Sequence, residues 1–188
     1  NTFCWSSDGT KIAFIDGDGW LCLVDADGGS LSKLAEIPSY STSWSPDGEK
    51  ISAGCFDYDI YTVDVGTGEL QNLTNTPDII ESLPSWSPDS QNIAFAVFNP
   101  PYFDISLMDA DGSNQTKITS ERGICEELAW SPGGENIGYT WYSEDDQGPE
   151  GICRDICLVD ISDGNKVNLT DSPKCDDRDS SWSPDGAR

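Results

Sequence analysis

The chain has 188 residues, with 34 acidic side chains, 10 basic ones, no histidine and a formal net charge of −24. The missing histidine excludes Ser-His-Asp and Cys-His catalysis, histidine-ligated zinc and a histidine pH switch. So negative a surface repels nucleic acid and anionic membranes, and the apolar runs are too short to span a membrane. We therefore expect no nucleic acid partner and no membrane insertion. The expected partners are cations, basic surfaces or neutral ligands.

One pentapeptide recurs along the whole chain and divides it into repeats. Four full repeats (5–43, 44–85, 86–129 and 130–181) and a fifth start (182–188) result, and the intervals suit four-stranded propeller blades. In Ser-Pro-Asp-Gly, proline fixes φ at the second position and glycine accepts a positive φ at the last, which predicts a turn. The motif Trp-Ser-Pro-Asp-Gly, or a close variant, begins at Trp5, Trp44, Trp86, Trp130 and Trp182.

Within each repeat, apolar runs stand at regular distances from the tryptophan and predict β-strands. They favour Ile, Val, Phe and Tyr, as half-buried strands do. We therefore expect an all-β propeller of four-stranded antiparallel blades, with strands A to D and the tryptophan at the end of A, packed between neighbouring blades. In chain order, a strand opens at Ile12, Ile51, Ile93 and Ile137, a second spans 21–25, 60–64, 105–109 and 156–160, and a third landmark is Leu34, Leu73, Ile118 and Leu169.

The connections between these strands vary in length on one face only. The spacings across the A–B and C–D turns are constant, whereas those across the B–C and D–A connections differ between repeats. In an up-and-down blade the B–C and D–A loops leave the same end, here called the B–C/D–A face. Insertions concentrated on one face of a repeat array usually mark the binding face, so we expect a partner to bind there.

The repeat W-S-P-D-G-x-x-I-A-F, followed by D-I-Y-x-x-D and L-T, resembles the propeller repeat of TolB and related periplasmic proteins. It also resembles the propeller domains of prolyl-oligopeptidase-like peptidases. The resemblance covers essentially the whole chain, although family members commonly have six or seven blades. It implies a rigid scaffold that binds a protein or peptide and is not an enzyme, in a protein located in the periplasm, at the cell surface or outside the cell.

Two other functions remain open. One is an accessory propeller of a larger serine peptidase, whose hydrolase domain would lie elsewhere because the chain has no G-x-S-x-G motif and no histidine. The other is a structural subunit of an extracellular head-to-tail homopolymer, in which a surplus terminal A strand pairs with a neighbouring copy.

Acidic residues in or beside the long loops of the fourth repeat are candidate calcium ligands. Calcium prefers several convergent carboxylate oxygens. Because no D-x-D-x-D-G loop with a distal glutamate is present, solvated loop charge is the favoured interpretation, and we expect no other cofactor. The candidates are Asp145, Asp146, Asp155, Asp176 and Asp177.

Seven cysteines are many for a reducing compartment and predict disulfides in an exported protein. A Cys153–Cys175 bond would constrain the long B–C connection of the fourth repeat, and Cys125 is the competing partner. Cys4, beside the first tryptophan, is the candidate for an intermolecular bond.

Three N-x-[ST] sequons surround the outer D strands, at Asn72, Asn114 and Asn168. They are accessible acceptors if the source glycosylates exported proteins, but two arise because the Leu-Thr of the repeat follows asparagine, so chance is a strong alternative. The segment 99–103, in a B–C loop, contains two aromatic residues and is either a peptide-contact patch or a loop that packs on itself.

Overall fold

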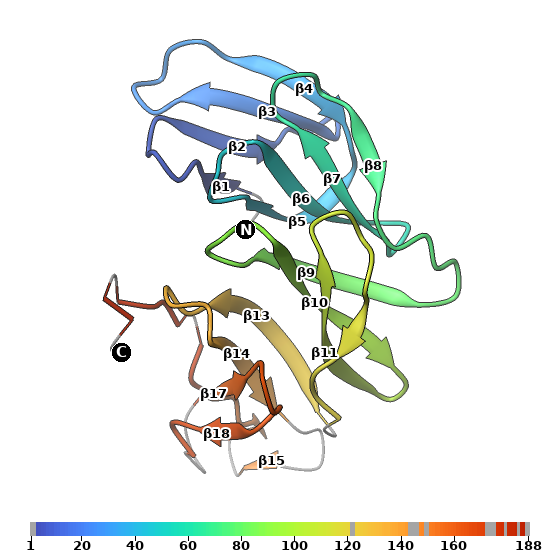
Figure 1. The fold of residues 1–188 in the computed structure, drawn as a ribbon, viewed down its shortest axis with the longest axis vertical. Coiled ribbons are helices and arrows are strands. Elements are labelled where there is room, and N and C mark those ends of the chain that lie inside the picture. The colour runs from blue at the N-terminus through green and yellow to red at the C-terminus, as the bar shows by residue number, and fades with distance from the viewer. Residues whose placement is uncertain are drawn as a thin grey trace.

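Eighteen β-strands make up the secondary structure of the computed structural model, which describes residues 3–120, 123–142, 147–148, 151–171, 176–178, 180–183 and 185–186. Sixteen strands form four antiparallel sheets of four, which follow one another along the chain from blue to red in Figure 1. The expected all-β fold of four-stranded antiparallel blades is confirmed. No helix long and apolar enough to cross a membrane occurs among these residues.

Each sheet is one blade whose strands lie side by side in chain order. Blade 1 contains β1 (Phe3–Trp5), β2 (Lys11–Ile15), β3 (Trp20–Asp25) and β4 (Ser32–Glu36). Blade 2 contains β5 (Ser39–Trp44), β6 (Lys50–Cys55), β7 (Ile60–Asp64) and β8 (Leu70–Asn72). Blade 3 contains β9 (Ile80–Trp86), β10 (Asn92–Asn99), β11 (Tyr102–Asp109) and β12 (Thr116–Lys117). Blade 4 contains β13 (Ile124–Trp130), β14 (Asn136–Tyr142), β17 (Asp155–Asp160) and β18 (Lys166–Asn168).

Blade 4 differs from the others in its B–C connection. Between β14 and β17 the chain forms an additional two-stranded hairpin, β15 (Gln147–Gly148) and β16 (Gly151–Ile152), which pairs outside the blade. This hairpin occupies the longest B–C spacing in the sequence, so the variable face carries additional structure in this blade.

The A–B turns have the geometry that the Ser-Pro-Asp-Gly motif predicts. In blade 2 the Gly48 amide donates to the Ser45 carbonyl over 2.9 Å, and Gly48 has a φ of 79°. The Ser45 hydroxyl donates to Asp47 over 2.6 Å and accepts from the Lys50 amide over 2.9 Å. These bonds satisfy the polar groups of the turn locally, because serine and aspartate side chains bond readily to nearby backbone.

The hydrophobic cores lie between blades rather than within them. Three clusters join blades 1 and 2, blades 2 and 3, and blades 3 and 4. Trp44, Trp86 and Trp130 each belong to the cluster against the preceding blade and are 6–9% exposed. Their expected position between neighbouring blades is confirmed.

Two indole nitrogens also bond to the preceding A strand. Nε1 of Trp130 donates to the Ser85 carbonyl over 2.9 Å, and Nε1 of Trp182 donates to the Ala129 carbonyl over 3.1 Å. By contrast, Trp5 is 52% exposed on the face of blade 1 turned away from blade 2. The repeat therefore places the same residue type in opposite surroundings within one chain.

Glycines in the C–D turns set how closely blades approach at the other face. Gly68 and Gly112 have φ of 74° and 90°, and a Cβ on either would lie 2.6 Å from a carbonyl oxygen in, or just beyond, the D strand of the preceding blade. Those oxygens belong to Leu34 and Leu73, which are landmarks of the sequence repeat. A side chain at these turns would therefore push two blades apart.

Candidate binding site

A carboxylate at the start of the C strand is buried in three of the four blades. Asp59 of blade 2 is 8% exposed and accepts hydrogen bonds from Nδ2 of Asn72 (2.6 Å), the Thr76 amide (3.0 Å) and the Thr74 hydroxyl (3.4 Å). We call Asp59, Asp104 and Asp155 the C-strand aspartates. In blade 2 this residue ties the C strand to the D strand and to the following D–A connection.

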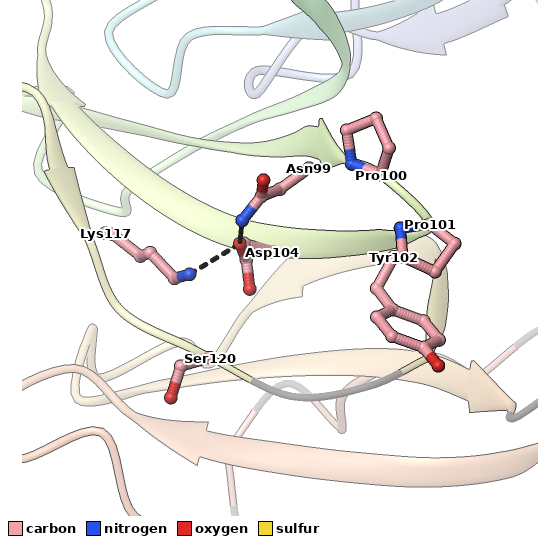
Figure 2. Close-up of a pocket in the computed structure, with 7 residues that line it drawn as sticks. All are labelled: Asn99, Pro100, Pro101, Tyr102, Asp104, Lys117 and Ser120. Atoms are coloured by element: carbon pink, nitrogen blue, oxygen red, sulfur yellow. Dashed lines mark hydrogen bonds and ion pairs between the residues drawn. The ribbon is translucent and has the colours of Figure 1, made fainter.

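Blade 3 uses a cation in the same place. Nζ of Lys117 lies 2.6 Å from Oδ2 of Asp104, and Nδ2 of Asn99 donates to the same oxygen over 3.3 Å. Figure 2 shows both side chains directed at Asp104, at the edge of a cavity of about 390 Å³. The ring of Tyr102 is directed away from this carboxylate in the same view. Blade 1 has Trp20 at the equivalent position, with Nζ of Lys33 5.2 Å from its ring centre.

A second cavity, of about 420 Å³, adjoins the first and shares Asn99, Pro100, Asp104 and Lys117 with it. It extends to the D–A connection of blade 2 through Thr76, so we call it the blade 2/3 cavity. Its walls come mainly from the B–C and D–A connections and the strand ends beside them, with further residues of β10, β11 and the start of β12. Both cavities therefore lie at the B–C/D–A face.

Glu81, near the start of β9, is a buried carboxyl in the wall of the blade 2/3 cavity. It is 2% exposed, and its Oε2 has no hydrogen-bond partner among the described residues. Burial raises the pKa of this carboxyl, and the charge of Asp59 acts in the same direction. The hydroxyls of Thr74 and Thr76 lower the pKa but offset only part of this effect. Sequence reasoning did not single out Glu81, since a lone glutamate beside a strand carries no signal of burial.

The aromatic residues of the 99–103 loop divide between the two interpretations given above. The rings of Phe98 and Phe103 contact each other, with their centres 4.9 Å apart. This pair packs the ends of β10 and β11 together. Tyr102 is half-buried and lines the first cavity. The loop therefore packs partly on itself while contributing one aromatic residue to a cavity.

The candidate calcium ligands do not gather into a site in the part of the chain that is described. Asp155 accepts hydrogen bonds from Asn168 and Thr170 of its own blade. Asp176 pairs with Arg154 over 3.1 Å and also with Arg178. No described group of three or more His, Cys, Asp or Glu side chains could hold a metal ion. Asp177 is described and exposes its side chain partly, whereas Asp145 and Asp146 lie outside the described residues.

The cysteine candidates lie in different surroundings. Cys125 is a free thiol, 5% exposed, in the core between blades 3 and 4, so the structure does not place it in the competing disulfide. Cys4 is a free, half-buried thiol that packs against the core between blades 1 and 2. Burial raises the pKa of both thiols, which disfavours the thiolate needed for disulfide exchange. Cys175 lies outside the described residues, so the Cys153–Cys175 bond stays a prediction.

Two of the three sequon asparagines are engaged by the C-strand aspartates. Nδ2 of Asn72 donates to Asp59 over 2.6 Å, and Nδ2 of Asn168 donates to Asp155 over 2.8 Å. Glycosylation would modify the same nitrogen atoms. Asn114 is exposed in the C–D turn of blade 3, where its Nδ2 donates to Asp109 over 2.6 Å. All three Nδ2 atoms therefore bond to an aspartate, and the asparagines differ in burial, since Asn114 and Asn168 are exposed and Asn72 is half-buried.

Solved structures of two kinds of protein share this fold. A TolB candidate from Agrobacterium tumefaciens superposes with a TM-score of 0.77 at 26% identity, covering 89% of this chain and 64% of that protein. TolB from Acinetobacter baumannii gives a TM-score of 0.72 at 20% identity, over 90% and 43% of the two chains. Oligogalacturonate lyase from Vibrio parahaemolyticus gives 0.74 at 19% identity, over 99% and 56%. The last two likenesses show the fold alone, and the chain spans less than two thirds of the length of each of these proteins.

The sequence itself provides the assignment to a family. No curated protein sequence matches the chain. The family model of the TolB β-propeller domain matches residues 9–188, which is nearly the whole chain. The five tryptophan motifs and the four blades agree with this match. The chain therefore belongs to the TolB β-propeller domain family.

Proposed function

We propose that the chain is a non-enzymatic binding propeller that engages a protein or peptide through its B–C/D–A face. The observation that carries this proposal is the position of two adjoining cavities at that face, one of about 390 Å³ lined by blade 3 and one of about 420 Å³ that extends to the D–A connection of blade 2. A rigid sheet scaffold with variable loops at one end is a common arrangement for binding sites. The membership of the TolB family supports the same class of function.

The absence of enzymatic activity is part of the proposal. The chain has no histidine, so general acid–base chemistry would have to rely on carboxylates, lysines, tyrosines or cysteines. The C-strand aspartates are held by neighbouring donors such as Asn72 and Lys117. We propose that they hold strands together rather than act on a substrate, and that the likeness to oligogalacturonate lyase extends only to the fold.

An exported location, in the periplasm or outside the cell, completes the proposal. The number of cysteines and the TolB family support it, whereas the free thiols of Cys4, Cys22, Cys55 and Cys125 do not add to it. The peptidase accessory role and the head-to-tail homopolymer stay alternatives. Light scattering at several concentrations tests the homopolymer, because polymerisation by strand addition increases the measured mass with concentration.

Selection of displayed random peptides on the immobilised chain tests the binding function. Ser120→Arg places a bulky side chain at the mouth of the first cavity, and Ser113→Arg is the matched control in the C–D turn of the same blade. We expect selected peptides to lose affinity for the Ser120 variant and to keep it for the Ser113 variant. A selection without binders, or binders affected only by the Ser113 variant, would contradict the proposal.

A further inference from the structure

The wall of the blade 2/3 cavity contains a glutamate, Glu81, whose backbone is held in place by hydrogen bonds while one of its carboxyl oxygens has no hydrogen-bond partner among the described residues. The Glu81 amide donates to the Tyr58 carbonyl over 2.9 Å, and the Tyr40 hydroxyl donates to the Glu81 carbonyl over 3.0 Å. Both partners belong to blade 2, so the backbone of Glu81 is anchored across the blade interface. Its Oε2 nevertheless lacks a hydrogen-bond partner in the described part of the chain. A buried acceptor without a donor is costly, which makes this atom a natural point of attachment for a ligand.

The register of blade 3 shows what surrounds this carboxyl. Val97 of β10 pairs with Glu81 on one side and with Asp104 on the other. Directly paired residues project from the same face of a sheet, so the two acids lie on either side of Val97, about 10 Å apart at two strand spacings. Asp104 already has Lys117 as its counter-ion at 2.6 Å. Asp78, which is exposed, adds a further negative group at the cavity wall.

The rest of the wall combines apolar side chains with uncharged polar ones, which include Asn99, Ser106 and Gln115. Phe95 and Val97 line the cavity and belong to, or pack against, the core between blades 2 and 3. Phe98 and Ile79 line it as well. A cavity with apolar side chains in its wall beside a buried carboxyl suits a side chain with a long hydrocarbon stem and a cationic head, as lysine and arginine have.

In blade 4, a glutamate of the A strand forms an ion pair with an arginine of the same blade. Nε of Arg154 lies 2.9 Å from Oε2 of Glu126, and the guanidinium stacks on Tyr142 at 4.7 Å from the ring centre. Glu126 follows Cys125, the residue that occupies in blade 4 the register position of Glu81. An arginine therefore pairs with an A-strand glutamate at the same end of blade 4, one residue away from the register position of Glu81.

We propose that the blade 2/3 cavity takes the side chain of a lysine or arginine from a bound protein or peptide, whose cationic head donates to Oε2 of Glu81. This rests on the proposed binding function and specifies the partner's chemistry. The net charge of −24 favours the approach of basic partners, since charge complementarity steers association. An uncharged donor, such as an amide, is the competing occupant.

A direct test uses small probes and does not depend on knowing the partner. Binding of Nα-acetyl-arginine N-methylamide to the full chain is followed by NMR, with the citrulline analogue as the uncharged isostere. We expect the arginine probe to bind at least about 10-fold more tightly than the citrulline probe, since hydrogen bonds between charged groups are stronger than those of a neutral donor. Equal affinity for the two probes, or no binding of the arginine probe, would overturn the inference.

Variants locate the bound probe. Glu81→Gln removes the charge and keeps the shape, and we expect it to weaken the arginine probe about 10-fold. Asp78→Asn, an exposed change at the same cavity, is expected to weaken it about 2-fold and guards against a folding defect in the first variant. Asp18→Asn, in the B–C turn of blade 1, is the control with the same change in charge and no expected effect. An unchanged affinity in both Glu81→Gln and Asp78→Asn would overturn the inference.

The peptide selection separates this inference from the proposed function. Peptides that contain a required basic residue and lose affinity for Glu81→Gln support both. Binders without a basic residue, or insensitive to Glu81→Gln, overturn the inference and leave the binding function standing. If no peptide is selected, the proposed function fails and the arginine probe still decides whether the cavity accepts a cation.

Discussion

The close approach of the C–D turn glycines to the preceding blade can be tested by two matched substitutions. Gly28 and Gly112 end the same Asp-Ala-Asp-Gly turn, in blades 1 and 3, with φ of 82° and 90°. Alanine at either position adopts a left-handed backbone, which costs about 1–2 kcal/mol. The two sites differ in their surroundings. A Cβ on Gly28 meets no atom within 4 Å, whereas a Cβ on Gly112 lies 2.6 Å from the Leu73 carbonyl oxygen.

That distance sets the size of the expected difference. An ordinary contact begins at 3.4 Å, so the turn of blade 3 and the backbone of blade 2 at Leu73 must separate by 0.8 Å, the difference between 3.4 and 2.6 Å. Overpacking of this kind costs about 1–3 kcal/mol. We therefore expect Gly112→Ala to lower the free energy of unfolding by about 2–5 kcal/mol and Gly28→Ala by about 1–2 kcal/mol.

Urea unfolding followed by circular dichroism measures both variants. The slope of the transition should be the same for the two, so that the midpoints report stability alone. Gly68→Ala is a second instance, since its Cβ would also lie 2.6 Å from a carbonyl oxygen, and it should behave like Gly112→Ala. Equal midpoints for the Gly28 and Gly112 variants would refute the argument that turn glycines determine blade spacing.

Three further predictions follow from individual side chains. Trp130→Phe should lower the free energy of unfolding by about 1–2 kcal/mol more than Trp86→Phe in urea unfolding, because Nε1 of Trp130 bonds to the Ser85 carbonyl whereas Nε1 of Trp86 has no partner among the described residues; equal losses would contradict the role of that bond. Burial raises the pKa of Glu81 above its ordinary value of 4.5, so its contribution to stability is complete below that value and is lost as the pH rises through the folded pKa. The free energy of unfolding of the wild type relative to Glu81→Gln should therefore fall as the pH increases from about 4, and a constant difference would count against a buried, raised carboxyl. In a host that glycosylates exported proteins, peptide mass mapping should find glycan on the exposed Asn114 and Asn168 in preference to the half-buried Asn72; equal occupancy of the three would show that this burial does not protect Asn72.

The blade architecture could be predicted because short motifs determine it locally. The Ser-Pro-Asp-Gly turn closes on its own side chains, as Ser45 and Asp47 show, and so it can be recognised without knowledge of the rest of the fold. The expected C strand at 60–64 coincides with β7. The D landmark was less accurate, because Leu73 lies just beyond β8 while its amide still bonds to the Ile60 carbonyl.

The candidate site was harder to predict because it depends on contacts between repeats. Glu81 is buried beside residues that are distant along the chain, which include Tyr40 and Tyr58 of blade 2 and the hydroxyls of Thr74 and Thr76. The hydrogen bond between Asn72 and Asp59 joins residues 13 apart in the sequence. The asparagine of a glycosylation sequon therefore also links the D strand of blade 2 to the start of its C strand. A pattern along the chain identifies the face of the propeller, but the chemistry of a cavity requires the neighbouring blade.

The placement of the cores between blades has a consequence for how the chain unfolds. The three core clusters are joints that each connect two consecutive blades, so blades 2 and 3 each contribute to two of them and blades 1 and 4 to one. Cooperativity in such an array passes from neighbour to neighbour, so the loss of one joint divides the chain into two partly independent pieces. The blade 2/3 cavity adjoins the middle joint, between blades 2 and 3, because Phe95 and Val97 contribute to both. A ligand bound there would couple the two halves of the chain. Its binding should slow the exchange of backbone amide hydrogens in the blades on both sides of that joint.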